Sequence, residues 1–255
     1  MKYTYTLPDG LYYKPYLIDM VENNHTLIAG MTGSGKSVLE NDIMYALLCT
    51  KFPDGENGAR FILIDPKKVE LNCYKDLPHT IMYADDIEKT LSALNYVRQI
   101  IDNRLQTMQR LGERKFRGCP IYVIIDELVD LMTSKQAKTI TQLIADSISI
   151  ARATGVYFLM LTQAPNRKIL RAEIVLNCSC RCALFCRDPQ ESRQIIGDSS
   201  ACDLPKHGLG IVQDGIERYQ ISIPMYSDEE IDEIVRHWTK QHPIHNYFKH
   251  RKTRL

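Results

Sequence analysis

The sequence predicts an α/β domain with a mainly parallel central sheet flanked by helices on both faces. Short apolar stretches, typical of buried strands, alternate along the chain with longer stretches whose apolar residues recur at helical spacing. Polar residues also follow four of the predicted strands directly, and parallel sheets bind ligands at these carboxyl ends. The four residues are Gly30, Asp65, Asp126 and Gln163.

The element pattern divides the chain into three parts. Strands are expected at 25–29, 61–65, 121–126, 156–162 and 180–186, with a hairpin at 209–223 turning at Asp214-Gly215. Helices are expected at 36–50, 86–111, 135–153 and 228–239, and Ser227 with Glu230 forms a capping box for the last. Residues 3–18 predict a small β-hairpin around Pro8-Asp9-Gly10. We therefore expect an N-terminal hairpin at 1–24, the α/β domain at 25–241 and a basic tail at 242–255.

Composition restricts the possible partners and the compartment. The 255 residues contain 32 Lys and Arg against 31 Asp and Glu, so contacts with nucleic acid must come from local basic clusters. The sequence shows no signal peptide and no apolar run that would span a membrane, so we expect a cytoplasmic protein. The cysteines at 178, 180, 182 and 186 share an even spacing that predicts one strand face. We interpret them as packing residues rather than zinc ligands.

A phosphate-binding loop joins the first predicted strand to the first predicted helix. Its glycines would aim backbone amides at phosphate oxygens, and the helix adds the positive end of its dipole. Lys36 is expected to reach the β- and γ-phosphates of ATP, and Ser37 to hold Mg²⁺. The alternative is a glycine-rich turn with a chance lysine. The loop and its flank comprise Gly30, Met31, Thr32, Gly33, Ser34, Gly35, Lys36, Ser37 and Val38.

Two further strand ends complete the predicted nucleotide site. After Ile121-Tyr-Val-Ile-Ile, Asp126 is expected to hold Mg²⁺, and Glu127 to activate the attacking water. Gln163 is expected to contact the γ-phosphate or that water. The alternatives are a solvated acidic pair at 126–127 and an ordinary polar strand end at Gln163.

Four segments resemble the motor domain of FtsK/SpoIIIE-type DNA translocases. They are His25-Thr-Leu-Ile-Ala-Gly-Met-Thr-Gly-Ser-Gly-Lys-Ser-Val38, Ile62-Leu-Ile-Asp-Pro-Lys-Lys-Val-Glu-Leu71, Ile124-Ile-Asp-Glu-Leu-Val-Asp-Leu-Met132 and Ala151-Arg-Ala-Thr-Gly155. Arg181 and Ser192-Arg193 also stand at the family's spacing, and weaker similarity extends from about Gly10 to Trp238.

The resemblance implies a RecA-like P-loop ATPase that forms a hexameric ring around double-stranded DNA. Arg152 matches the arginine that the family places on a neighbour's γ-phosphate, although a salt bridge at a helix end is the alternative. Arg193 would be a second nucleotide-linked arginine. Two positions depart from the family: Ala164 replaces the arginine of Thr-Gln-Arg-Pro, and Pro189 replaces a basic residue. Both put efficient hydrolysis in question.

Two basic loops are candidates for DNA contact. One contains Arg114, Lys115 and Arg117, and the other follows Gln163 with Arg167, Lys168 and Arg171. In a ring, such loops would form a basic collar that holds phosphates without reading sequence. The alternative for each is ordinary solvated surface.

Three functions remain open on the sequence. The first is an ATP-driven translocase of double-stranded DNA, which would suit a mobile element such as a plasmid, an integrative element or a phage, with a relaxase or other DNA-processing protein as a possible partner. The second is a protein-secretion ATPase of the type VII kind. The third is a nucleotide-dependent DNA-binding scaffold with little turnover. Intact Lys36, Asp126 and Glu127 speak against the scaffold, and stimulation of hydrolysis by DNA would separate the first function from the others.

Overall fold

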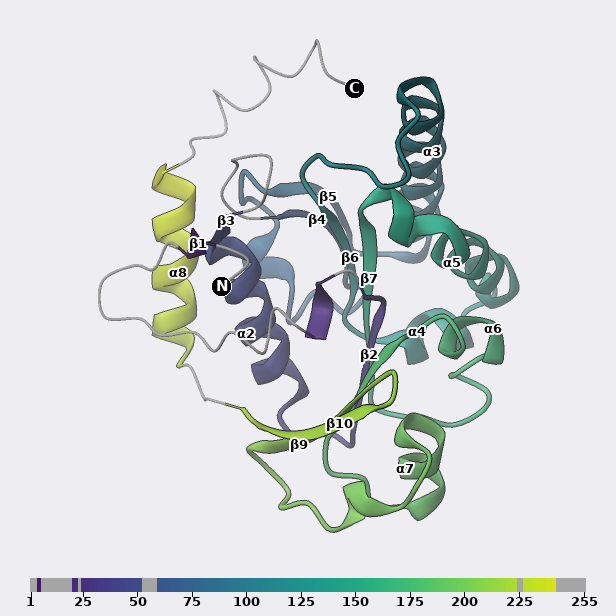
Figure 1. Cartoon of the computed structure of the whole chain (residues 1–255). Helices are drawn as coiled ribbons and strands as arrows, with labels where there is room; N and C mark the ends of the chain where they lie inside the picture. Colours follow the sequence, from purple (N-terminus) through teal and green to yellow (C-terminus); the bar gives the residue numbers. More distant parts are fainter. Residues whose placement is uncertain (1–3, 6–19, 23, 52–58, 224–226, 242–255) are drawn as a thin grey trace.

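An eight-stranded sheet forms the centre of the computed structural model, which describes residues 4–5, 20–22, 24–51, 59–223 and 227–241 (Figure 1). The strand order is β10-β9-β8-β2-β7-β6-β4-β5. All pairs from β8 to β5 are parallel, and β9 and β10 add an antiparallel hairpin at one side. The strands are β2 (Thr26–Ala29), β4 (Arg60–Ile64), β5 (Thr80–Ala84), β6 (Ile121–Ile125), β7 (Val156–Thr162), β8 (Cys180–Ala183), β9 (Leu209–Asp214) and β10 (Glu217–Ser222).

Helices cover both faces of the sheet, which confirms the predicted α/β class. The helices α2 (Lys36–Cys49) and α8 (Asp228–Gln241) pack on one face, where Trp238 is completely buried. The other face carries α3 (Ile87–Leu111), α4 (Leu128–Thr133), α5 (Ala137–Ala151), α6 (Ala172–Val175) and α7 (Pro189–Ile196). Successive side chains of β2 point to opposite faces of the sheet. Ile28 therefore packs on the face covered by α2 and α8, whereas Leu27 and Ala29 pack on the other face.

Local sequence signals account for the ends of the long helices. Asp86 caps α3 by accepting a hydrogen bond from the Lys89 amide at 2.7 Å, and Gly112 ends the helix in the left-handed region. The capping box of α8 forms as predicted, with Ser227 and Glu230 exchanging backbone-to-side-chain bonds of 2.7 and 3.3 Å. The hairpin also turns at Gly215 as expected, with φ +56°.

Among the described residues, the sequence prediction missed one strand of the central sheet and three short helices. They are β5, α4, α6 and α7. β5 is an edge strand whose first four residues are all half-buried, so it lacks the alternation that marks a strand. The three helices are too short to show an apolar period, although Asp188 followed by Pro189 at the first helical turn marks the start of α7.

The predicted N-terminal hairpin lies almost wholly outside the described residues, as does the basic tail at 242–255. The described part, β1 (Thr4–Tyr5), pairs antiparallel with β3 (Thr50–Lys51), which follows α2. Within the described ranges, no helix is long and apolar enough to cross a membrane.

The cysteines do not share one strand face, so that part of the prediction is wrong. Cys180 and Cys182 pack in the α2 and α8 cluster, whereas Cys178 and Cys186 pack on the opposite face. The reason is that β8 spans only residues 180–183, so strand alternation does not extend to 178 or 186. All four are buried free thiols whose pKa values burial raises, as expected of packing residues.

Candidate nucleotide site and basic pocket

Four neighbouring strands end at one edge of the sheet and carry the predicted site there. Because β2, β7, β6 and β4 are adjacent and parallel, the residues that follow them share this edge. Backbone bonds extend the ladder past the strand ends, from the Gly30 amide to the Thr162 carbonyl at 3.3 Å and from the Asp126 amide to the Ile64 carbonyl at 3.2 Å. We call this end of the four strands, marked by Gly30, Asp65, Asp126 and Gln163, the nucleotide edge.

The loop between β2 and α2 has the backbone that a phosphate cradle requires. Gly33 and Gly35 have φ values of +76° and +101°, which L side chains rarely adopt. Gly30 is confined for a different reason, because a Cβ there would stand 2.7 Å from Leu184 Cβ. Lys36 is buried and donates from Nζ to the Gly30 carbonyl at 3.1 Å. The lysine is therefore already turned back toward the loop that would hold the phosphates.

Lys36 lies in an acidic environment. Burial lowers its pKa, while the carboxylates of Glu127, Asp126, Glu70 and Glu40 oppose that shift. A buried ammonium surrounded by carboxylates retains its charge at neutral pH more easily than one in apolar surroundings. The arrangement suits a cation that must pair with phosphate oxygens.

Glu127 is fixed at the centre of the nucleotide edge by backbone amides. It is buried, and it accepts hydrogen bonds from the Gln163 amide at 3.1 Å and the Val129 amide at 3.1 Å. Gln163 in turn accepts a 2.6 Å bond through its side-chain oxygen from the Thr32 hydroxyl. The structure therefore connects the phosphate loop, the end of β7 and the candidate base in one chain of contacts.

The oxygen groups around Asp126 fit a magnesium ion. Burial, followed by the charges of Asp65, Glu70 and Glu127, raises the pKa of Asp126 to about 7, against an opposing effect of Lys67. A divalent cation would relieve this accumulation of negative charge, and Mg²⁺ prefers oxygen ligands. Among the described residues no group of three or more His, Cys, Asp or Glu side chains is arranged as a metal site. Mg²⁺ usually keeps several water ligands and takes others from substrate phosphates, so it needs only one or two carboxylates from the protein.

Arg152 lies at the opposite edge of the sheet from the phosphate loop of its own chain. It follows α5 and precedes β7, whose seven residues correspond to roughly 20 Å of strand. Its charge helps burial to lower the pKa of His25, at the start of β2, to about 3. The structure therefore does not bring Arg152 to its own nucleotide edge, and its predicted role requires a second copy.

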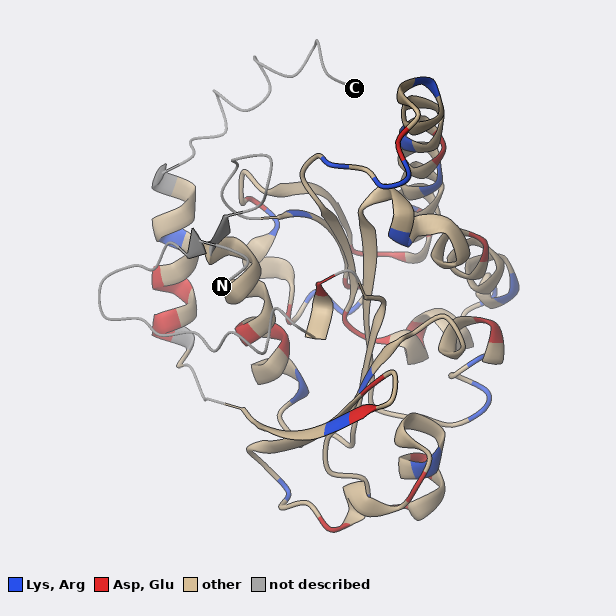
Figure 2. Ribbon diagram, in the orientation of Figure 1, with Lys and Arg blue, Asp and Glu red and all other residues tan. Residues whose placement is uncertain are grey.

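The two basic loops also lie at opposite edges (Figure 2). The loop with Arg114, Lys115 and Arg117 follows α3, and Phe116 of this loop stacks under Arg104 at 4.0 Å. Arg104 also donates to the Thr154 carbonyl at 2.9 Å, which holds the loop beside the segment of Arg152. The loop of Arg167 and Lys168 instead begins four residues after Gln163, next to the nucleotide edge.

A basic pocket joins this second loop to α7. The pocket has a volume of about 770 Å³ and contains three cationic and three amide side chains. Its lining residues are Asn166, Arg167, Lys168, Gln190, Arg193 and Gln194. Arg193, predicted to contact nucleotide, thus lies with the predicted DNA contacts. Arg171 is exposed at the start of α6 and does not line the pocket.

Comparisons with known proteins agree with this geometry. The sequence model of the FtsK/SpoIIIE family matches residues 1–120. The chain is 32% identical to DNA translocase FtsK of Leptospira interrogans over 238 residues, which is 86% of this chain and 25% of that protein. It is 30% identical to DNA translocase FtsK of Haemophilus influenzae, over 88% of this chain and 49% of that protein. The chain belongs to the FtsK/SpoIIIE family.

Solved structures of low sequence identity share the P-loop ATPase fold of this FtsK/SpoIIIE protein. The conjugation coupling protein TcpA of pCW3, solved with ATPγS, has a TM-score of 0.74 at 22% identity, covering 91% of this chain and 75% of that one. The type VII secretion ATPase EccC of Thermomonospora curvata has a TM-score of 0.68 at 22% identity, covering 84% and 28%. The chain spans between a quarter and a half of the length of the curated FtsK relatives described above.

One residue of this FtsK/SpoIIIE site escaped the sequence prediction. Glu70 accepts a 2.7 Å hydrogen bond from the Ser37 hydroxyl, which is a predicted magnesium ligand. The signal for it is the segment Asp65-Pro-Lys-Lys-Val-Glu70-Leu, which carries the family resemblance without having received a role. Its place at the candidate site depends on a contact between residues 33 positions apart, and spacing alone does not reveal such a contact.

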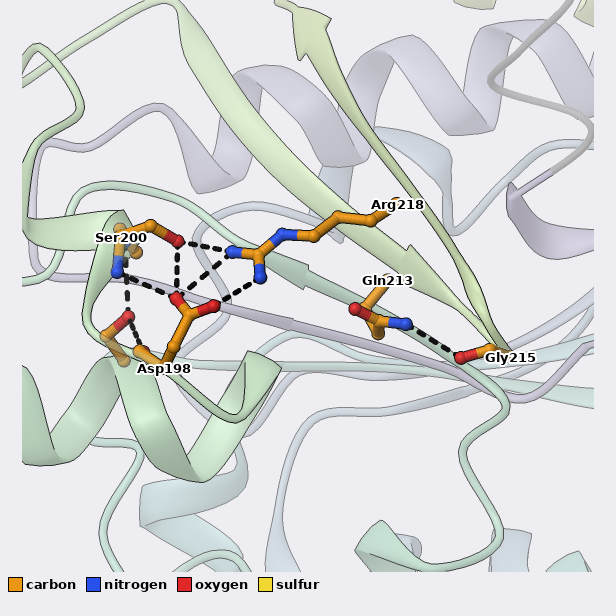
Figure 3. Close-up of polar contacts among 7 residues, drawn as sticks. Asp198, Ser200, Gln213, Gly215 and Arg218 are labelled. Carbon is orange, nitrogen blue, oxygen red and sulfur yellow. Dashed lines mark hydrogen bonds and ion pairs between the residues drawn. The ribbon is translucent and has the colours of Figure 1, made fainter.

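An ion pair connects the antiparallel hairpin to the segment that follows α7 (Figure 3). Arg218 of β10 donates to both the Asp198 carboxylate and the Ser200 hydroxyl. These bonds from Arg218 are the main cause that lowers the pKa of Asp198. Because α7 carries Arg193, the hairpin helps to hold one wall of the basic pocket.

Proposed function

We propose that this FtsK/SpoIIIE protein hydrolyses ATP at the nucleotide edge and uses the energy to move double-stranded DNA. The observation that carries the proposal is the contact chain from Thr32 through Gln163 to Glu127, beside Lys36 and Asp126. A change at the γ-phosphate would pass through this chain to the end of β7. The basic loop begins a few residues later, so hydrolysis and DNA contact would share one segment.

Each residue would have a separate task in hydrolysis. Lys36 would neutralise the β- and γ-phosphates, and Gln163 would report the state of the γ-phosphate through Thr32. Glu127 would accept a proton from the attacking water, since its carboxylate is already held by two backbone amides. Ser37 and Asp126 would hold Mg²⁺, which would supply positive charge against the negative charge that develops on the phosphates.

We propose that the neighbouring subunit of a ring, most simply a hexamer, completes each site with Arg152. A guanidinium neutralises the charge of the transferred phosphoryl group, and Arg152 is exposed at the edge away from its own site. Complementation tests this arrangement. Lys36→Ala and Arg152→Ala should each be inactive alone, and their equimolar mixture should recover about a quarter of the wild-type rate in a random ring.

The quarter follows from counting sites in the mixture. An active site needs an intact Lys36 in one subunit and an intact Arg152 in the next, and each condition holds for half of the subunits. Light scattering of the mixture checks that rings form. A mixture as inactive as its components, despite ring formation, would show that Arg152 does not act between subunits.

For DNA contact, we propose the basic pocket rather than the loop after α3. The pocket loop begins four residues after Gln163, whereas the other loop lies at the far edge of the sheet. Arg167 and Lys168 would bind backbone phosphates, and Arg193 would add a third cation from α7. The contacts would be independent of sequence.

Two matched double variants test this proposal. Arg167→Ala with Lys168→Ala should weaken duplex DNA binding about tenfold or more and reduce the salt slope by about 2. The stimulation of ATP hydrolysis by linear duplex DNA should fall with it, while hydrolysis without DNA persists. Arg114→Ala with Lys115→Ala removes the same charge at the other edge and should have a much smaller effect. The reverse ranking would move the DNA contact to the loop after α3.

The same assay decides between the functions that the sequence leaves open. Hydrolysis that is indifferent to DNA in the wild-type protein would favour a secretion ATPase. Nucleotide binding without turnover would favour a DNA-binding scaffold.

We further propose that the protein acts in the cytoplasm on the DNA of a mobile element, with a relaxase or other DNA-processing protein as partner.

A further inference from the structure

We propose that Glu70 is a positioning residue for the magnesium ligand Ser37, an inference that rests on the proposed ATP site. Its carboxylate Oε1 accepts a hydrogen bond from the Ser37 hydroxyl at an oxygen-to-oxygen distance of 2.7 Å. A hydroxyl has one proton and two lone pairs, so donation to Glu70 leaves both lone pairs free for a cation. A carboxylate acceptor also makes the serine oxygen a better ligand, as outer partners of metal ligands generally do.

The segment around Glu70 is held in place from both sides. Asp65, at the end of β4, accepts bonds from the Lys68 amide at 2.8 Å and the Leu71 amide at 3.1 Å. Lys68 has a φ of +62°, the only positive value of a non-glycine residue in the described ranges. Such a conformation is costly for lysine and persists only where the surrounding contacts enforce it. Here those contacts place Glu70 on the nucleotide edge.

A second contact fixes the same segment against α2. The Tyr74 hydroxyl donates to the Asn41 side-chain oxygen at 2.7 Å, and Tyr74 is buried. Asn41 follows Ser37 by one helical turn, so the two residues share a face of α2. The segment 65–74 therefore docks on α2 through two successive turns, and only the first of these contacts reaches a metal ligand.

The role predicted for Glu70 is distinct from that of a direct ligand or a distant charge. As a positioning residue it acts through Ser37 and should affect the magnesium-dependent part of nucleotide binding. Glu70→Gln keeps an oxygen acceptor within reach of Ser37 but removes the charge. Glu70→Asp keeps the charge but withdraws it by one methylene group, which breaks the contact. The two variants therefore separate contact from charge.

The experiment is a titration of a fluorescent ATP analogue with the full chain, in EDTA and at increasing Mg²⁺. Mg²⁺ is expected to increase the affinity for the nucleotide. In Glu70→Ala, the Mg²⁺ concentration that gives half of this increase should rise about tenfold or more. Affinity in EDTA should stay within about twofold of wild type. Glu70→Asp should resemble the Ala variant, whereas Glu70→Gln should recover most of the wild-type Mg²⁺ response. Glu173→Ala, an exposed carboxylate on α6, provides the matched control.

Each contrary result has a definite meaning. An unchanged Mg²⁺ response in Glu70→Ala would overturn the positioning role while leaving the ATP site intact. A wild-type response in Glu70→Asp together with a defect in Glu70→Gln would show that long-range charge matters instead of contact. Weaker binding already in EDTA, with a lowered melting temperature, would assign Glu70 a structural role. A wild-type protein that binds no nucleotide would overturn the proposed function itself.

Discussion

Glu127→Gln is expected to lower the rate of ATP hydrolysis by about 10²–10⁴-fold, the usual contribution of a positioned general base. The carboxylate at the end of β6 is held by the amides of Gln163 and Val129, so it is ready to accept a proton without rearranging. Glutamine fills the same space but does not accept a proton at neutral pH. Phosphate release, measured with and without linear duplex DNA, reports the effect.

Nucleotide binding should survive the same substitution. Lys36 keeps its contact with the Gly30 carbonyl, and Ser37 and Asp126 are unchanged. The affinity for ATPγS with Mg²⁺ should therefore remain within a few-fold of wild type, and Glu173→Gln should leave both binding and rate unchanged. A rate within about threefold of wild type for Glu127→Gln would place the general base elsewhere.

Asp126→Asn should have opposite effects on function and on stability. Hydrolysis should fall below detection, because a neutral amide is a poor ligand for Mg²⁺. The nucleotide-free protein should nevertheless become more stable, since burial and the charges of Asp65, Glu70 and Glu127 make the Asp126 carboxylate unfavourable in the folded state. The gain should be roughly 1–3 kcal/mol at neutral pH and above. The melting temperature rises by about 2–4 °C per kcal/mol for a chain of this size.

The pH dependence of that gain provides an internal control. The pKa of Asp126 is about 7 in the folded protein, above the value of about 3.9 for an unfolded aspartate. Between these values the folded state binds more protons, so the wild-type protein loses stability as pH rises through this window. The difference in melting temperature between Asp126→Asn and wild type should vanish near pH 4 and grow toward pH 7. A constant difference over this range would assign the stabilisation to packing instead.

Much of the proposed nucleotide site follows from local sequence. The phosphate loop requires glycines at fixed positions because of backbone φ, and the structure has positive φ at Gly33 and Gly35. The buried strands at 60–64, 121–125 and 156–162 show as apolar runs, and each is followed by a polar residue that the parallel sheet brings to the same edge. Neighbours in sequence suffice for these inferences, since turn, strand and helix signals are short-range.

The positions of the two basic loops could not be predicted from local sequence. Arg114-Lys115 and Arg167-Lys168 are both short basic clusters in the sequence. Nothing in such a cluster indicates at which end of the parallel strands it will lie. The order of the parallel strands places one loop at the amino edge and the other at the carboxyl edge. Arg193 joined the second loop only because α7 packs beside it, and α7 is too short to show an apolar period.

The sequence by itself determined the α/β class, the phosphate loop and the identity of the acidic residues that follow β6. Only the tertiary structure decided that Glu127 is held by the Gln163 amide, that Glu70 accepts a hydrogen bond from Ser37, and that Arg152 lies away from its own site. The physical reason is the separation in sequence between the residues that interact. Backbone conformation and capping depend on residues within a few positions, whereas these contacts depend on strand order and helix docking.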